Sequence, residues 1–493
     1  MKNRGSFSAL RLFSIFFILL ALVLTVFQLI RFSRMRANLP AGLQIAGVPV
    51  GGTDRQTASQ RVLQAYSHPI EIRYNGAPVQ MTPNDADFQL NIDNMLAIAE
   101  SQRTQNNFWA EFWDFLWRRS SVPYDVPLSA TSSEARLRNY LDEISKRYDE
   151  PPIPAQPQPG TVYFQPGRSG TSVDIDSSVL LIENALNSLS NRVVDLPIKQ
   201  TKPSRPPFKN LEILLQQTIK VSGFDGLVSV YLLDLQNAQE MHFAYQSGEL
   251  LPVNPDIAFT ASSIIKIPIM VSVYKSINNA DEETLKLMED MVDRSGNEAA
   301  DWLMDRTMDK GFGPLIVSEI MEKLGLDNTF LAGYFSLGSP ILQAFSTPSN
   351  QRTDINTDPD PYSQTTTSDM GMLLVDIYQC AETGGGALTA IYPGEITQAE
   401  CKEMIEYLIK NSLPSLLTAG LPDGTEIAHK HGWVSNNGII NTVGDAGIIF
   451  SPGGDYALVV FLHHPDQVVW EPASTLVAQL SQAVYNYYNL PSQ

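Results

Sequence analysis

The sequence predicts an α/β protein of three parts: a transmembrane helix, a mixed α+β domain and a larger α+β sandwich. Three observations lead to this prediction. An almost unbroken apolar run covers Leu12–Ile30, a proline-rich stiff connector covers Pro151–Pro159, and beyond Phe208 predicted strands flank a long helical middle. Because strands lie at both ends of that last segment, its ends must pair to complete one sheet. We expect a membrane anchor over residues 10–31 and domains over residues 41–202 and 209–493.

The composition limits the kinds of partner. The 493 residues carry a formal net charge of -19, which argues against nucleic acid because phosphate binding needs a basic face. The two cysteines, Cys380 and Cys401, cannot form a disulfide framework. They could form one bridge outside the cell, but we expect two buried thiols.

The apolar run is about long enough to cross a bilayer, so we expect the membrane to be a partner through this helix. Basic residues flank it almost equally and do not fix its orientation: Lys2, Arg4 and Arg11 before it, and Arg31, Arg34 and Arg36 after it. A cleaved signal peptide is the alternative. The length of the run, and the lack of a small-residue cleavage site soon after it, favour an uncleaved single-pass anchor.

The middle domain should contain short strands and helices. The expected elements are a strand and turn over Ile45–Thr53, a helix over Thr57–Tyr66, a hairpin of Ile70–Tyr74 with Val79–Met81, a helix over Ser177–Leu189 and a strand over Val193–Gln200. Phe108–Trp117 holds three of the six tryptophans, and its apolar residues cover most of a helix circumference. We expect a buried helix there, and the alternative is a helix at the membrane interface, where tryptophan is favoured.

Two glycine motifs bound this domain, Gly47-Val48-Pro49-Val50-Gly51-Gly52 and Pro166-Gly167 leading to Gly170 and Val173-Asp174. With the helix and strand that follow, they resemble the peptidoglycan-binding domain of VanW/YoaR-type envelope proteins. The resemblance implies peptidoglycan as a partner. It assigns no chemical role to any residue, since the glycines are needed as turns in any case.

In the last domain the expected elements are a helix over Asn210–Val221, strands over Gly226–Asp234, Met241–Tyr245, Gly438–Asn441, Ala446–Phe450 and Ala457–His463, and a closing helix over Ala473–Tyr488. Ser263 and Lys266 open a helix in its middle and, three residues apart, lie on one face. A serine becomes a nucleophile when a base takes its proton, and a lysine in apolar surroundings can be that base. By itself the pair also fits a buried helix start capped by serine.

Two further motifs follow in order, Ser295-Gly296-Asn297 and Lys430-His431-Gly432. Individually, Ser295 and Asn297 could cap a helix and Lys430 could be an exposed strand lysine. The order of all three motifs resembles the penicillin-recognising serine hydrolases, and most closely the class A β-lactamase-like domain with its β-lactamase/transpeptidase-like fold. The resemblance covers about residues 209–493.

The resemblance implies a role for each matching residue. Ser263 would be the acylated nucleophile, Lys266 its base or relay, and Ser295 a proton donor to the departing amide nitrogen. Asn297 would hold Lys266 and the substrate. Lys430, His431 and Gly432 would border the substrate carboxylate, and the N–H groups of Ser263 and Trp433 would form an oxyanion hole.

The sequence also departs from the family pattern. Gly296 replaces the usual aspartate, and His431 replaces a hydroxyl residue but could donate a similar bond. The glutamate that activates the deacylating water in the family is missing, because no glutamate occurs between Glu322 and Glu382. The loop Ala332–Gln364 offers only aspartates in a solvated context as substitutes: Asp354, Asp358 and Asp360.

These observations predict a membrane-anchored serine hydrolase of the class A β-lactamase type with slow deacylation, facing the cell exterior, where β-lactams and peptidoglycan are met. Its expected substrate is a β-lactam or a D-Ala-D-Ala-like peptide. The alternatives are a D,D-peptidase (a penicillin-binding protein) acting on peptidoglycan, and a wall-binding scaffold without turnover. We expect no cofactor and no metal, since the sequence has neither a His-Glu-x-x-His zinc motif nor a Gly-x-x-x-x-Gly-Lys phosphate loop.

Overall fold

The computed structural model describes residues 6–105, 107–119, 124–411, 413–436 and 438–490. Its contacts divide the chain into unit 1, Met1–Pro152 with Ser169–Lys202, and unit 2, Ile153–Arg168 with Pro203–Gln493. The segment Ile153–Arg168, which the sequence analysis placed in the middle domain, belongs to unit 2. There β8 (Gln156–Pro157) pairs with β9 (Phe164–Gln165), and Phe164 joins the core of unit 2.

Unit 2 is built on a six-stranded antiparallel sheet in the order β15-β14-β13-β21-β20-β19. The central strands join distant parts of the chain, because Leu227–Asp234 pairs with residues 456–463. The prediction that the two ends of this domain complete one sheet is therefore confirmed. The strand bounds are β13 Leu227–Asp234, β14 Glu240–Gln246, β15 Glu249–Leu250, β19 Glu426–Asn436, β20 Ile439–Phe450 and β21 Tyr456–His463.

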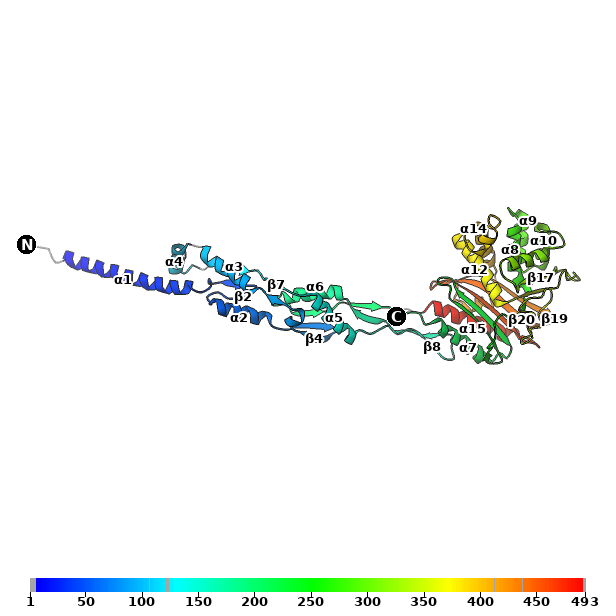
Figure 1. Cartoon of the computed structure of the whole chain (residues 1–493), viewed down its shortest axis with the longest axis horizontal. Helices are drawn as coiled ribbons and strands as arrows, with labels where there is room; N and C mark the ends of the chain where they lie inside the picture. Colours follow the sequence, from blue (N-terminus) through cyan, green and yellow to red (C-terminus); the bar gives the residue numbers. More distant parts are fainter. Residues whose placement is uncertain (1–5, 106, 120–123, 412, 437, 491–493) are drawn as a thin grey trace, which may run out of the picture. The chain divides into compact units, whose positions relative to one another are not determined.

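Both faces of this sheet are covered, as Figure 1 shows: α7 (Phe208–Ser222) and α15 (Trp470–Tyr488) lie on one face, and α8 (Lys266–Ser276) and α12 (Thr367–Thr383) lie on the other. Alternate side chains of β13 enter the two cores. All eight residues of β13 are buried, and six of them are apolar, so the strand does not alternate between apolar and polar residues. The remaining elements of this unit are β16 Phe259–Thr260, η2 Ser262–Ile265, α9 Glu282–Val292, α10 Asn297–Thr307, α11 Gly313–Lys323, β17 Phe330–Leu331, β18 Ser363–Thr365, α13 Ala387–Ile391, α14 Gln398–Ile409 and η3 Thr418–Gly420.

Three sequence expectations about strands need correction. Two of the predicted strands form one continuous strand, β20, because Thr442–Gly444 keep the ladder with β21 unbroken. The Lys430 motif, which precedes the predicted strand Gly438–Asn441, itself lies inside edge strand β19. In unit 1, the strand predicted over Val193–Gln200 is two strands in different sheets, β11 (Val193–Asp195) and β12 (Ile198–Thr201), and Pro197 lies between them.

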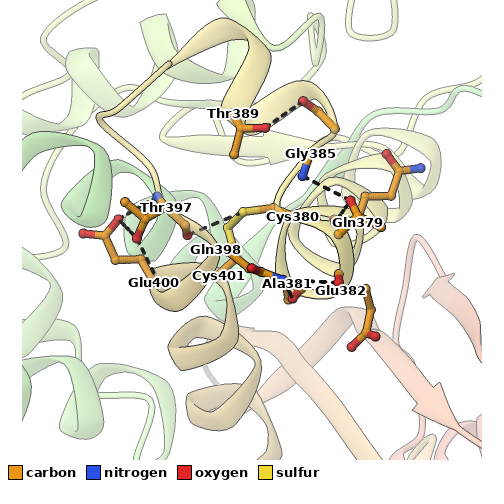
Figure 2. Close-up of a disulfide and its surroundings, with 12 residues drawn as sticks. Gln379, Cys380, Ala381, Glu382, Gly385, Thr389, Thr397, Gln398, Glu400 and Cys401 are labelled. Carbon is orange, nitrogen blue, oxygen red and sulfur yellow. Dashed lines mark hydrogen bonds between the residues drawn. A yellow bond between two sulfur atoms is a disulfide. The ribbon is translucent and has the colours of Figure 1, made fainter.

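A disulfide joins Cys380 of α12 to Cys401 of α14, and Figure 2 shows the two helices linked by it. Our expectation of two buried thiols was wrong. Both cysteines are buried, as expected, but the packing of α12 against α14 brings their Cα atoms to 5.9 Å, within the range that a disulfide requires.

Unit 1 holds two small hydrophobic cores. One lies between β3 (Ile70–Tyr74), β4 (Ala77–Met81), α5 (Glu134–Tyr148), α6 (Ile175–Leu186) and β11. The other is formed by β1 (Leu43–Ile45), β2 (Val48–Pro49), α2 (Arg55–Tyr66), α3 (Ile92–Gln105) and β6 (Tyr124–Val126). The remaining elements are η1 Pro83–Ala86, β5 Gln89–Leu90, β7 Ala130–Thr131 and β10 Gly170–Val173.

The amino-terminal helix α1 (Ser6–Arg36) is long and apolar enough over Arg11–Arg36 to cross a membrane, properties that a signal sequence shares. The aromatic segment forms α4 (Phe108–Leu116). Its predicted burial was wrong, because only one face is covered: Phe112 is 5% exposed, whereas Trp109 and Trp113 are 65% and 57% exposed.

Removing the disulfide should destabilise unit 2. The bridge closes a loop with a sequence separation of 21 residues, for which the chain-entropy model gives about 3 kcal/mol. We expect Cys380→Ala/Cys401→Ala to lower the free energy of unfolding by about that amount, measured by denaturant titration. The wild-type chain unfolded with reductant is the control and should match the variant. Equal stability of the oxidised and reduced wild-type chains would contradict the bridge.

Candidate active site

Ser263 and Lys266 meet across a single tight turn. Ser263 lies in the 3₁₀ turn η2 and Lys266 begins α8. In a 3₁₀ turn, side chains three residues apart eclipse one another. Lys266 Nζ accordingly lies 3.1 Å from Ser263 Oγ, a hydrogen-bonding distance.

The second motif contacts the same amine. Lys266 Nζ donates to the carbonyl oxygen of Ser295 at 2.6 Å and to Asn297 Oδ1 at 2.8 Å, and it lies 3.2 Å from Ser295 Oγ. Asn297 is the first residue of α10, and Ser295 lies in the turn between α9 and α10. The structure therefore brings four predicted site residues together around one nitrogen atom.

The surroundings of this amine lower its pKa. Lys266 has no exposed surface, and burial lowers its pKa to about 7, with a further decrease from the charge of Lys430. Asp301 and Asp290 oppose the shift. Near neutral pH the amine is therefore divided between its charged and neutral forms. In the neutral form its lone pair can accept the Ser263 hydroxyl proton.

Two serines at the site have strained backbones. Ser262 has a φ of 52° and Ser295 a φ of 60°, in the left-handed region that non-glycine residues rarely adopt. Such strain persists only where the surrounding structure holds it, and it is concentrated at functional sites. At Ser295 it places the carbonyl oxygen and the hydroxyl on the same neighbour, Lys266.

Lys430 supplies a second buried amine. It has no exposed surface, and its Nζ has no hydrogen-bond partner among the residues that the structure describes. Burial lowers its pKa to about 8, while Asp445 and Asp293 act in the opposite direction. A buried ammonium without a partner is unfavourable by several kcal/mol, so this position is suited to an anionic ligand.

Gly432 allows strand β19 to pass close to the 3₁₀ turn. A Cβ atom added at Gly432 would lie 2.8 Å from the backbone nitrogen of Ser263 and 2.9 Å from the Cβ of Ser262. Any larger residue must therefore push β19 away from Ser263. Trp433 follows on the strand and is 37% exposed.

His431 is neutral, and one tautomer is fixed. The Asn411 side-chain nitrogen donates to the backbone carbonyl of His429 at 3.0 Å and lies 3.2 Å from His431 Nδ1. Because a carbonyl oxygen only accepts, the amide atom is a donor, so Nδ1 accepts from it and the imidazole proton lies on Nε2. Burial, followed by the charge of Lys430, lowers the pKa of His431 to about 3. His431 also stacks on Trp433, with ring centroids 5.3 Å apart.

A carboxylate occupies the space beside Gly296. A Cβ added at Gly296 would lie 2.6 Å from Asp290 Oδ2, so a larger residue would have to displace this side chain. The carboxylate beside Gly296 thus comes from α9 (Glu282–Val292).

The loop beyond α11 places an aromatic ring against the central amine. The Phe335 ring centroid lies 5.3 Å from Lys266 Nζ. Asp301 of α10 holds this part of the loop, accepting from the backbone nitrogens of Phe335 and Ser336 at 2.9 Å each. At this distance the ring limits access to the amine.

Of the three aspartates considered as substitute bases, two have other partners and one is exposed. Asp354 forms a two-point pair with Arg352 at 3.0 and 2.7 Å, which lowers the pKa of Asp354. Asp358 is exposed, and Asp360 accepts from the backbone nitrogen of Tyr362. Within the described part of the chain, none of them has a recorded hydrogen bond to Ser263 or Lys266.

Sequence reasoning missed several residues of the site: Asp290, Asp301, Phe335, Asn411, His429 and Asp445. His429 and Asp445 form a fully buried pair at 2.9 Å next to the Lys430 motif. His429 is two residues before His431, so strand alternation could have placed it on the same face. Asn411 and Phe335 come from distant loops and leave no pattern in the sequence.

Two family models match parts of the chain. Residues 278–488 match the family model described as "Beta-lactamase enzyme family". Unit 2 contains a β-lactamase-family domain. The matched residues begin after Ser263 and Lys266, so the match covers Ser295, Asn297 and Lys430 but not the nucleophile pair. Residues 79–195 match the model "Putative peptidoglycan binding domain".

The predicted resemblance and fold class are therefore confirmed: a β-lactamase-family domain follows a peptidoglycan-binding domain. Similar solved structures include PBP-A (22% identity, 59% of this chain and 99% of that chain covered, TM-score 0.40). They also include TLA-1 extended-spectrum β-lactamase (18% identity, 57% and 99% covered, TM-score 0.42) and a β-lactamase from Sphaerobacter thermophilus (16% identity, 56% and 97% covered, TM-score 0.40). Comparison with curated proteins gives no match.

We expect Gly432→Ala to lower the free energy of unfolding by about 1–3 kcal/mol, because the added methyl group forces β19 and the turn apart. Gly385→Ala is the control, since its added Cβ meets only the rotatable Thr383 hydroxyl at 3.3 Å. Chemical denaturation measures both variants. A Gly432→Ala chain as stable as the control would contradict the close approach.

Proposed function

We propose that the chain is a membrane-anchored serine hydrolase of the class A β-lactamase type, acylated at Ser263 by β-lactams or by related cell-wall peptides. One observation carries the proposal: a fully buried lysine amine with a pKa of about 7 lies within hydrogen-bonding distance of Ser263 Oγ, Ser295 Oγ and Asn297 Oδ1. A serine beside such an amine has the arrangement required of an activated nucleophile.

In the proposed acylation, neutral Lys266 takes the Ser263 hydroxyl proton while Oγ attacks the substrate carbonyl carbon. The tetrahedral intermediate collapses when the carbon–nitrogen bond breaks. The proton returns from Lys266 through the Ser295 hydroxyl to the leaving nitrogen, and Ser263 remains as an ester. The N–H groups of Ser263 and Trp433 would hold the developing oxyanion, each contributing about 3 kcal/mol.

The buried amine of Lys430 would bind the substrate carboxylate. Its Nζ lacks a partner among the described residues, which a carboxylate would supply. His431 would present its Nε2 proton to the same anion as a neutral donor. Asn297 would contribute an amide to the substrate side chain, and Gly432 would leave room for the substrate beside β19.

A second candidate, a D,D-peptidase acting on peptidoglycan, is favoured by the surroundings of Lys266. Phe335 lies against its amine, Asp354 and Asp360 have partners elsewhere, and Asp358 is exposed. Without a base for the hydrolytic water, the ester would persist, as in a penicillin-binding protein. The peptidoglycan-binding domain would keep the enzyme at a wall substrate.

We propose that both units lie outside the cytoplasm, attached to the cell membrane by α1. The disulfide between Cys380 and Cys401 supports this location, because such bonds persist in oxidising compartments. A peptidoglycan-binding domain on the same chain supports it independently.

Labelled penicillin tests the proposed nucleophile. We expect an adduct on the peptide that contains Ser263, seen by mass spectrometry, and none in Ser263→Ala. Ser336→Ala is a matched control, since this serine also lies near the site but makes no recorded contact with Lys266, and it should keep the adduct. An adduct that survives Ser263→Ala, or none with any β-lactam, would favour the non-catalytic scaffold.

The two lysines predict a bell-shaped pH dependence of acylation. Lys266 must be neutral, so the rate should fall as the pH decreases below about 7. Lys430 must be charged, so the rate should fall as the pH rises above about 8. Stopped-flow acylation by a penicillin measures both limbs. With an activated ester that has no carboxylate as the substrate, the decrease in rate at alkaline pH should disappear and the decrease at acidic pH should remain. A rate constant independent of pH across this range would refute both assignments.

Slow deacylation predicts burst kinetics. We expect one β-lactam ring to open rapidly per enzyme molecule, followed by steady-state turnover about 10²–10⁴-fold slower than this first ring opening, the usual contribution of a general base. Asp354→Asn, Asp358→Asn and Asp360→Asn should leave both phases unchanged. Turnover of tens per second without a burst would contradict the prediction, and its loss in one of these variants would identify the base.

A further inference from the structure

The aromatic helix α4 exposes one stripe of tryptophans. Trp109, Trp113 and Trp117 are 65%, 57% and 64% exposed. Trp109 and Trp113 are four residues apart and lie on one face of α4, and Trp117, the C-cap residue, continues this face with its ring centroid 6.2 Å from that of Trp113. Three large aromatic side chains exposed side by side form an apolar patch that is unusual on a protein surface in contact with water. Such patches mark sites of association.

The other face of α4 packs on α1. Phe32 of α1 is 3% exposed, and the rings of Phe108, Phe112 and Phe115 surround it at centroid distances of 5.3–5.4 Å. Arg36 pairs with Glu111 at 3.0 Å and lies over the Phe108 ring. Figure 1 shows α4 beside the carboxyl-terminal end of α1. The two helices are thus joined by both apolar and charged contacts.

This contact lies where the apolar part of α1 ends. The run Leu12–Ile30 is about 28 Å long at 1.5 Å per residue, close to the thickness of a bilayer's hydrocarbon core. Phe32 follows its end by about 3 Å. With α1 spanning the membrane, α4 is held at the level where acyl chains give way to headgroups. Tryptophan is enriched at this level, since its ring is apolar and its N–H is polar.

We propose that α4 lies in the membrane interface, with Trp109, Trp113 and Trp117 contacting the boundary between lipid headgroups and acyl chains. The inference rests on the proposed anchoring by α1. The occupant of the stripe is lipid, because the stripe is attached to the end of the membrane helix. Exposed Arg31, Arg34 and Arg118 lie at or next to this contact and would meet lipid phosphates.

The exposed tryptophans would also restrict the motion of α1 in the membrane. A single apolar helix can rotate and tilt in a bilayer, whereas interfacial aromatic side chains restrict both motions. Because α4 is packed on α1, its tryptophans would fix the rotation of α1 and the depth at which unit 1 begins.

Depth-dependent quenching tests the inference on the full chain in vesicles of phosphatidylethanolamine and phosphatidylglycerol. Lipids brominated near the top of the acyl chain should quench roughly half of the tryptophan emission, since the stripe holds three of six tryptophans. Lipids brominated near the chain centre should quench less. The variant Trp109→Gln/Trp113→Gln/Trp117→Gln should lose the quenching. Trp302→Gln, which removes a 66% exposed tryptophan of unit 2, should keep it.

Two controls separate this inference from the proposed function. Resistance to alkaline extraction reports the anchor, and penicillin labelling of Ser263 reports the folded active site in each variant. Equal quenching of the wild-type chain and the triple variant, with the anchor intact, would overturn the inference. Self-association that is lost in the triple variant, without quenching, would overturn it in favour of a second copy. Release of the chain by alkali would refute both the anchor and the inference, whatever the labelling shows.

Discussion

The burial of the Lys266 amine is the interaction on which the site depends. A charged ammonium without exposed surface is unfavourable unless polar groups surround it or it loses its proton. Here both occur: Ser263, Ser295 and Asn297 supply oxygens, and burial lowers the pKa to about 7. The same feature that makes the lysine unfavourable for stability makes it available as a base at neutral pH.

The surrounding elements bury this amine and hold it in contact with its partners. Gly432 lets the edge strand β19 approach the turn of Ser263, and the left-handed backbone of Ser295 presents two oxygens to one nitrogen. Asp301 holds the loop that places Phe335 against the amine. These contacts come from different elements, all of which pack on the larger hydrophobic core of unit 2.

The sequence predicted one contact from its local spacing and one long-range pairing from the order of its elements. The spacing of Ser263 and Lys266 predicted their contact, and strands at both ends of the last domain predicted that its ends would pair, as β13 and β21 do. It could not predict contacts set by tertiary packing. Cys380 and Cys401 pair because α12 packs on α14, and Asp290 fills the space beside Gly296 from another helix. For α4, composition indicated an apolar helix, but only the packing on Phe32 shows which face is left exposed.

The central claim is that Lys266 can be neutral at physiological pH, and its titration tests this directly. In the full chain labelled with ¹³C at the lysine Cε, the Lys266 resonance, assigned by its loss in Lys266→Ala, can be followed by NMR as the pH is raised. We predict a midpoint of about 7, against 10.5 for an ordinary lysine. A midpoint at or above 10 would contradict a catalytic role for the amine as a base.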